Sequence, residues 1–430
     1  MLHDPAHVPS VPVAEEITFT PAEREVLRRL GHDLFEISQD PVNAERAALW
    51  TKLNDLRAER PMVWINEVPW HEMDVNDELL LISQGAFARQ LETKLRRILY
   101  QWRHFPGDMV VSPFVVCEKV IHSTDFGIVE QVDTLHTDAN NEIYSRHFHP
   151  QITEDADIEK IKMPRITYMR DATDFAFHAL SDLFRDVIGV RLEGQTHIWF
   201  TPWDYLIRWW GVTEAMLDLY ERPEMITKAY ERLVDAWCTE LDQLASQNLL
   251  SLDCNNTRVG SGGYGYVSAL PGDDFDAGHV KPHNMWGCSN AQIFACVSPQ
   301  MHWDFALKHD RKWLSRFGLT YYGCCEPLDG KIGLLRKIPN LRKISVSAWA
   351  DVRRTVSEIG KDYVMSRKPS PAVFAGAVYA EEQARSEILD FQEASEGLNV
   401  EYIMKDISTV HYKPERLWQW ETMVMKIIKS

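Results

Sequence analysis

The sequence predicts an α/β fold built on a parallel (βα)8 barrel, because apolar runs and helical stretches alternate from about residue 109 onward. Eight of these runs have strand character, which is the strand number of such a barrel. The competing fold is a doubly wound open sheet, which usually carries a glycine-rich phosphate-binding turn after its first strand. Residues 117–125 contain no such turn, so the barrel is favoured.

The predicted strands are short, apolar or aromatic, and bounded by turn residues. They cover residues 109–117, 196–200, 249–254, 284–288, 319–322, 344–347, 363–366 and 400–404. Helices are expected between most of them. One opens at Pro223, one is capped by Ser298 and opens at Pro299, and others cover residues 328–338, 350–359, 381–394 and 414–428.

A helical region is expected to precede the barrel, with helices at residues 21–38, 43–59 and 86–104. Thr20 can cap the first of them, and Pro21 suits its first position because that position needs no N–H donor. Residues 1–16 contain three prolines and no apolar core, so we expect a polar arm there and no secretory signal. The expected organisation is therefore an arm (1–16), a helical region (17–108) and the barrel (109–430).

The composition limits the class of protein. The formal net charge of −17 argues against nucleic-acid or anionic-membrane binding, since both need a basic surface. No apolar run approaches the length of a membrane span. Apolar residues make up 45% of the chain and Trp occurs 15 times, which indicates a well-filled core. The seven Cys form no disulfide-scaffold pattern, so we expect reduced thiols in the cytoplasm.

The stretch GLTYYGCCEP, residues 318–327, concentrates reactive groups at the end of a predicted strand. Tyr322, Cys324, Cys325 and Glu326 can ligate a metal or handle protons there. Adjacent strand residues point to opposite faces, so only one of the two thiols is expected to face the barrel centre unless Gly323 turns the backbone. The alternative is a pair of buried structural thiols, because free Cys is often buried.

Polar residues also follow the other predicted strands, and in a barrel such residues gather at one face. The candidates for substrate binding are Trp203, Asn255, Arg258, Tyr266, Gln292, Trp349 and Arg367. Tyr266 belongs to a glycine-rich segment, 256–278, which we expect to form a mobile flap or substrate loop. Lys405 and Asp406 end the last strand, where Asp406 can serve as a ligand or base whose pKa the lysine tunes. The alternative for this pair is a salt bridge on the rim.

These features resemble the uroporphyrinogen decarboxylase superfamily over about residues 165–430. The resemblance rests on the helical region before the barrel, on the Ser-Pro helix start in ACVSPQMHWDFAL, on YYGCCEP where many relatives have His-x-Cys-Gly, and on the ending VEYIMKDISTVHYKPERLWQW. The Arg-x-Ala-Gly-Arg-Tyr motif of the haem-pathway decarboxylases is absent. The chain therefore looks more similar to the corrinoid-system methyltransferase branch.

That branch implies a zinc site formed by His-x-Cys and a distant Cys near the last strand. This sequence departs from the pattern twice, because Tyr322 stands at the His position and the last strand offers Asp406 and no Cys. The resemblance implies metal ligands among Cys324, Cys325, Glu326 and Asp406, and catalytic roles for Tyr322, Glu326, Lys405 and Asp406.

The function implied by the resemblance is metal-assisted demethylation of a small methylated substrate, such as a methyl ether. The methyl group would pass to a corrinoid on a separate protein. The alternative is a metal-free decarboxylase or lyase, in which Arg258, Arg367 and Lys368 grip the carboxylates of a small substrate. A non-enzymatic barrel that binds a small molecule is a third hypothesis. We also expect a homodimer, as is common among large barrels of this superfamily.

Overall fold

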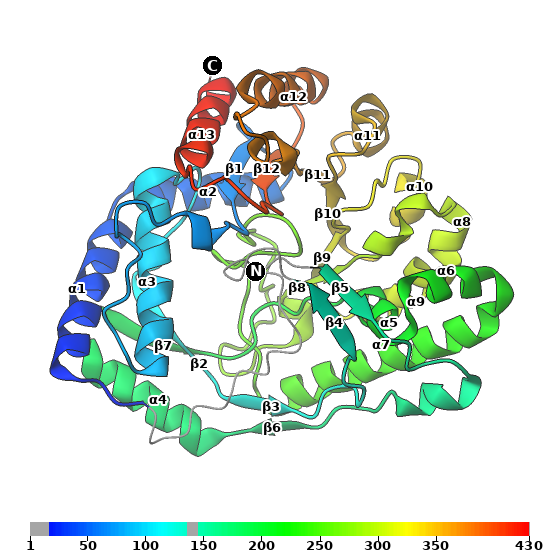
Figure 1. Cartoon of the computed structure of the whole chain (residues 1–430), viewed down its shortest axis with the longest axis horizontal. Coiled ribbons are helices and arrows are strands. Elements are labelled where there is room, and N and C mark those ends of the chain that lie inside the picture. Colours follow the sequence, from blue (N-terminus) through cyan, green and yellow to red (C-terminus); the bar gives the residue numbers. More distant parts are fainter. Residues whose placement is uncertain (1–16, 136–144, 430) are drawn as a thin grey trace.

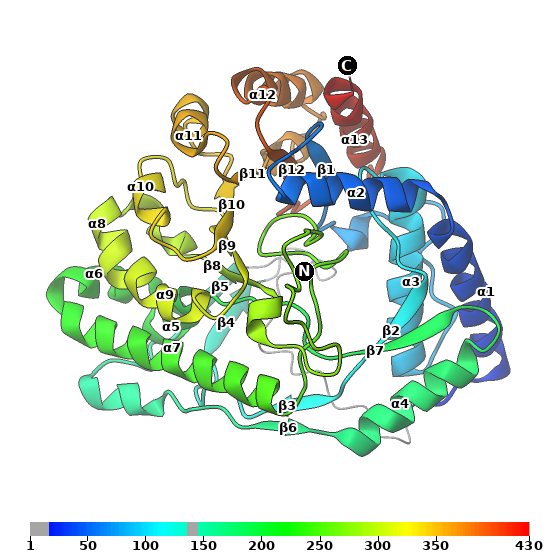
Figure 2. The same ribbon diagram turned by 180° about the vertical axis from the view of Figure 1, so that it is seen from behind.

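The computed structural model describes residues 17–135 and 145–429 (Figure 1, and from behind in Figure 2). The arm expected at residues 1–16 lies outside the described residues. The largest sheet has six parallel strands in the order β1-β12-β11-β10-β9-β8. Their bounds are β1 Met62–Ile65, β8 Trp286–Ser289, β9 Leu319–Tyr322, β10 Leu341–Val346, β11 Val364–Arg367 and β12 Val400–Met404.

Six further strands form three separate pairs. β2 (Phe114–Glu118) runs parallel to β7 (Gly189–Glu193), whereas β3 (Ile121–Ser123) with β6 (Ile166–Tyr168) and β4 (Val132–Leu135) with β5 (Ser145–Phe148) are antiparallel. Within the described ranges, no strand ladder joins the six-stranded sheet to the β2–β7 pair. The prediction of an α/β fold with a parallel sheet is confirmed, and the closed eight-stranded barrel is not.

Helices lie outside the six-stranded sheet in Figure 1, whereas β3 and β6 run along the lower edge of the view. The longer ones are α1 Pro21–Ser38, α2 Val42–Asn54, α3 Ala86–His104, α4 Arg170–Leu183, α5 Pro202–Trp210, α6 Val212–Glu221, α7 Pro223–Ser246, α11 Val352–Ile359, α12 Glu381–Ala394 and α13 Glu415–Ile428. The shorter ones are α8 Pro299–His302, α9 Lys308–Leu314 and α10 Ile332–Leu335, and a π-helical turn, Trp303–Leu307, joins α8 to α9. No helix in the described part of the chain is long and apolar enough to cross a membrane.

The predicted helix starts are confirmed where a cap defines them. The Thr20 side chain accepts a hydrogen bond from the Glu23 amide, and the Glu23 carboxylate bonds back to the Thr20 amide. Ser298 caps α8 by a single hydrogen bond, which its side chain accepts from the Met301 amide. A cap satisfies helix amides that have no partner within the helix, so it specifies the start locally.

Two predicted strands are absent as regular elements. Residues 196–200 form no strand, and Leu250 in the range 249–254 makes only an isolated parallel bridge, with Gln195. The strand expected at 109–117 begins only at Phe114. Apolar composition alone therefore overestimated the regular sheet in this part of the chain, because it reports burial and not hydrogen-bonded pairing.

One strand was missed. β1 lies within the range 17–108, which we expected to be helical, and it pairs with β12 at the other end of the chain. The run MVWI has only four residues, too few to show a period in the sequence. Its importance comes from a partner more than 330 residues away, since Ile65 is in register with Met404.

The glycine-rich segment is not a surface flap in its first part, because residues 259–265 are all buried. An added Cβ at Gly262 would lie 2.5 Å from the Glu401 carboxylate, and one at Gly263 would lie 2.4 Å from the Trp50 ring. Glycine is needed here because the backbone packs directly against side chains of the sheet and of α2. This segment lies in the middle of the molecule in Figure 2.

Candidate active site

The carboxyl ends of β9 and β12 bring four of the predicted residues together. Cys324 and Cys325 follow β9, and Lys405 and Asp406 follow β12. The Lys405 Nζ lies 3.7 Å from the Cys324 Sγ, 3.9 Å from the Cys325 Sγ and 2.5 Å from Asp406 Oδ2. Cys324 and Lys405 are buried, whereas Cys325 and Asp406 are exposed. We call these four residues the thiol–lysine cluster.

The two thiols differ electrostatically. Their sulfur atoms lie 3.6 Å apart. The hydrogen bond with Cys325 lowers the pKa of Cys324, and the positive charge of Lys405 acts in the same direction. The same hydrogen bond raises the pKa of Cys325. Cys324 is therefore the thiol that more readily carries a negative charge, and a thiolate is the nucleophilic form.

Lys405 is held in its charged form. Burial alone would lower the pKa of Lys405, but the negative charges of Cys324, Glu67 and Asp406 together raise it. Glu67 comes two residues after β1 and lies 3.5 Å from the Lys405 Nζ and 2.8 Å from the Arg258 guanidinium. Although burial opposes it, these two cations hold the pKa of Glu67 well below its usual range. The cluster thus continues as an ion-paired chain to Arg258.

The Cys324 backbone is fixed by a buried carboxylate. Glu326 accepts hydrogen bonds from the Cys324 amide at 2.8 Å and from the Ala291 amide, just beyond β8, at 3.1 Å. Burial raises the pKa of Glu326. Gly323 has a φ of 99°, and an added Cβ would lie 2.6 Å from Leu328. The turn predicted at Gly323 is therefore present, and it lets both sulfur atoms approach Lys405.

The implied zinc site can be tested against these residues. Within residues 17–135 and 145–429, no group of three or more His, Cys, Asp or Glu side chains is arranged to hold a metal ion. The Lys405 ammonium instead faces both sulfur atoms, and its positive charge would repel a metal bound to them. The residues as they lie do not fit a zinc site.

Several predicted residues have partners outside the cluster. The Gln292 amide donates to both carboxylate oxygens of Asp204, at 2.9 Å each. The Arg367 guanidinium donates to Glu387 at 2.7 Å and to the Ser347 carbonyl, and the residue is buried. These contacts are made within the protein, so neither side chain extends freely into the cluster.

The predicted aromatic residues Tyr322 and Trp203 also have partners outside the cluster. The Tyr322 hydroxyl lies 2.7 Å from His302 Nε2, and both side chains are fully buried. Trp203 is fully buried and donates its indole N–H to the Phe305 carbonyl at 2.9 Å. Trp349 is 80% exposed.

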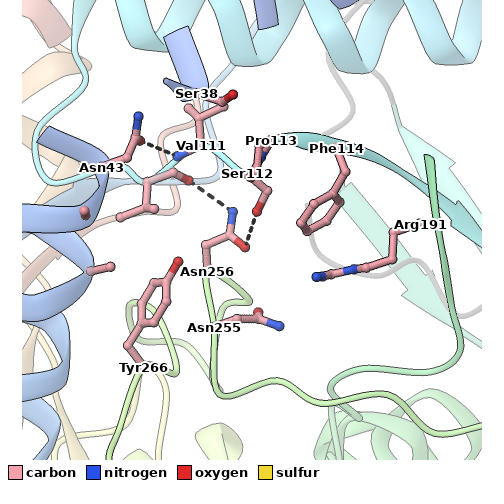
Figure 3. Close-up of a pocket in the computed structure, with 13 residues that line it drawn as sticks. Ser38, Asn43, Val111, Ser112, Pro113, Phe114, Arg191, Asn255, Asn256 and Tyr266 are labelled. Carbon is pink, nitrogen blue, oxygen red and sulfur yellow. Dashed lines mark hydrogen bonds between the residues drawn. The ribbon is translucent and has the colours of Figure 1, made fainter. Parts of the chain in front are cut away.

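Asn255 and Tyr266 line a different feature, a pocket of about 310 Å³ (Figure 3). Arg191 stacks over the Phe114 ring at 3.5 Å on one side of it. No member of the thiol–lysine cluster lines this pocket. Two of the predicted substrate-binding residues therefore share a site of their own.

Sequence reasoning missed Glu67 and gave Lys368 only a part in the lyase alternative. Glu67 follows β1, a strand that was not predicted, so its position at a strand end was missed. Lys368 is buried and donates to the Tyr321 hydroxyl at 2.5 Å and to Ser366. Burial lowers the pKa of Lys368 to about 7. An apolar run followed by an acid, MVWI and then Asn-Glu, is the signal that could have identified Glu67.

No protein-family model matches the sequence, and no curated protein matches it. Among solved structures, the chain is similar to a methyltransferase from Methanosarcina mazei, with a TM-score of 0.42 and 11% sequence identity. The alignment covers 70% of this chain and 76% of that one. The function of this chain therefore has to be argued from its own residues, and the family resemblance stays a prediction.

Proposed function

We propose that this protein is a methyltransferase that moves a methyl group from a small methylated substrate to a corrinoid on a separate protein. The reaction would occur at the thiol–lysine cluster. The observation that carries the proposal is the contact of 3.7 Å between Lys405 Nζ and Cys324 Sγ, which favours a thiolate at the carboxyl edge of the sheet. Methyl transfer is chosen over other thiolate chemistry because Cys324 stands at the Cys position of the His-x-Cys motif of the resembling family.

In the proposed reaction the Cys324 sulfur forms a bond to the methyl carbon of the substrate. The bond from that carbon to the leaving oxygen, nitrogen or sulfur breaks, and the leaving atom keeps the electron pair. Asp406 is exposed beside the thiols and can relay a proton to the leaving atom from water. In the second transfer the S–C bond would break and Cys324 would leave with its electron pair as a thiolate that Lys405 stabilises, while a reduced corrinoid on the partner protein would supply the electron pair for the new bond to the methyl carbon.

The proposal includes the barrel interpretation of the fold. The parallel β2–β7 pair and the parallel bridge between Gln195 and Leu250 supply strand segments that could complete a ring with the six-stranded sheet. It also includes a cytoplasmic location and a homodimer, and sedimentation of the purified chain would test the homodimer. Metal assistance stays a prediction, and no step of the proposed reaction depends on it.

The decarboxylase or lyase alternative has weaker support. It needs cations that are free to grip carboxylates, but Arg258 is paired with Glu67 and Arg367 with Glu387. Lys368 is buried among hydroxyl and carbonyl oxygens. An anionic substrate would have to compete with these internal partners.

The test compares Cys324→Ala with Cys325→Ala, using a reduced free corrinoid as acceptor and a panel of small methyl ethers, amines and thioethers as donors. The parent should methylate the corrinoid, Cys324→Ala should lose the activity, and Cys325→Ala should retain a substantial part. Without the acceptor, the peptide containing Cys324 should gain the mass of one methylene group. Full activity of Cys324→Ala would refute the mechanism. Metal analysis of the three proteins tests the zinc prediction separately.

A further inference from the structure

Two asparagines at the carboxyl edge of the sheet have unusual side chains. Asn66 directly follows β1 and Asn290 directly follows β8, and they are 8% and 1% exposed. Among the side chains that the structure describes, these two alone leave both atoms of a buried amide without a hydrogen-bond partner. Such groups are destabilising in a folded protein, so each one requires an explanation.

The sheet register places both amides beside the central contact of the cluster. The Asn66 amide N–H donates to the Met404 carbonyl at 2.9 Å, so Asn66 lies beside Lys405. Ser289 is in register with Tyr322 and accepts a hydrogen bond from the Gly323 amide at 2.9 Å, so Asn290 lies beside Gly323 and Cys324. One asparagine thus neighbours each partner of the 3.7 Å contact between Lys405 and Cys324.

The charges that contact Lys405 directly are already matched within the protein, and the nearby buried Lys368 donates its hydrogen bonds to Tyr321 and Ser366. Lys405 lies against Glu67 and Asp406, and Arg258 also pairs with Glu67. The nearby Glu326 carboxyl is buried. No unpaired cation among these residues would attract an anionic group, whereas two amides can each offer a donor and an acceptor to an uncharged one.

We propose that Asn66 and Asn290 form the substrate-recognition site of the cluster and bind an uncharged polar group of the carboxamide class. This inference rests on the proposed function because it places substrate recognition at the same site. It adds the chemical class of the substrate. A carboxamide presents a donor and an acceptor in one plane, which complements the two donors and the acceptor of an asparagine amide. The two asparagine side chains then select the substrate, and the Cys324 thiol carries out the methyl transfer.

The experiment measures binding of three isosteric probes to the full chain by ligand-observed NMR: acetamide, acetate and acetamidinium. The parent should bind acetamide most tightly. Asn66→Leu and Asn290→Leu should each weaken acetamide binding by about tenfold, the effect of one lost hydrogen bond. Each should also raise the melting temperature by about 1–4 °C, because an unpaired buried amide is removed.

The matched control is Asn54→Leu. Asn54 is also buried, but its amide donates to the Tyr264 and Tyr266 carbonyls at 2.9 and 2.6 Å. This variant should lower the melting temperature and leave acetamide binding unchanged. If the leucine variants at positions 66 and 290 do not fold, Asn66→Asp and Asn290→Asp replace them, and each should shift the preference from acetamide to acetamidinium.

Each outcome supports or overturns the inference. Tighter binding of acetate or acetamidinium by the parent would overturn the substrate class, as would no binding of any probe. Unchanged acetamide binding in the variants, or a loss of thermal stability like that of Asn54→Leu, would show that the amides are structural. Loss of methyl transfer in every assay, with asparagine-dependent acetamide binding retained, would refute the proposed function and leave this inference standing.

Discussion

Replacing Lys405 by Met tests the electrostatic basis of the proposed site. Methionine keeps much of the length of the lysine side chain and removes its charge. Two unit charges 3.7 Å apart attract by about 4 kcal/mol at an effective dielectric constant of about 20. Both groups are buried, so solvent screening is weak. Losing this attraction lowers the thiolate population of Cys324 roughly a thousandfold near neutral pH.

The reactivity of each remaining thiolate partly compensates. A thiol of higher pKa is a better nucleophile once ionised, with a Brønsted coefficient of about 0.4–0.5, so about half of the logarithmic loss is recovered. Alkylation of Cys324 by iodoacetamide at pH 7 should therefore be about 30-fold slower in Lys405→Met than in the parent. Mass spectrometry with fragment assignment separates Cys324 from Cys325, and the exposed Cys296 serves as an internal reference.

The matched control is Lys312→Met, which removes an exposed lysine that pairs with Asp235 at 2.5 Å. In this variant, iodoacetamide should alkylate Cys324 at the same rate as in the parent. Circular dichroism of each variant confirms that the fold is retained. Equal alkylation rates for the parent and Lys405→Met would refute the reasoning, because the ammonium would then have no effect on the thiolate.

Two further predictions concern stability. Lys343 and Glu401 are fully buried and their charged groups lie 3.0 Å apart. Lys343→Met should therefore lower the free energy of unfolding, measured in urea, by about 3–5 kcal/mol, because the buried Glu401 carboxylate loses its ion-pair partner. The double variant Lys343→Met with Glu401→Gln should recover most of this loss. Equal stability of Lys343→Met and of the double variant would contradict this prediction. Burial lowers the pKa of His302 from 6.5 to about 3. Between these values the unfolded chain binds the proton and the folded chain does not, so stability falls as pH drops below 6.5. Between pH 7 and pH 5, His302→Gln should lose about 2 kcal/mol less free energy of unfolding than the parent. The same pH dependence of stability in the parent and in His302→Gln would count against this prediction.

The elements that local signals specify were predicted closely. The helices at 21–38, 86–104 and 381–394 and the strands at 319–322 and 400–404 have the expected bounds. Caps, prolines and apolar periodicity act within a few residues, so they can be read from a single stretch of chain. The strand-end positions of the thiol pair and of Lys405-Asp406 followed from the same signals.

The site itself could be predicted only in part. A strand end suggested that Cys324 and Lys405 share one face, and their 3.7 Å contact agrees with this. The sequence had no means of showing that Glu67 joins them, because β1 has four residues and its partner is β12. Tyr322 was expected among the reactive groups, but its hydroxyl contacts His302. Alternate strand residues point to opposite faces, and only packing determines which face each one meets.

The sequence by itself determined the α/β class, the bounds of several helices and the concentration of thiols, acid and lysine at strand ends. Each of these depends on short-range composition and spacing. The tertiary structure decided that the glycine-rich segment is buried against Glu401 and Trp50, and that Asn66 and Asn290 flank the cluster. It also decided that the Lys405 ammonium faces the two sulfur atoms. These are contacts between segments far apart in the chain, and their geometry arises only when the strands pair in register.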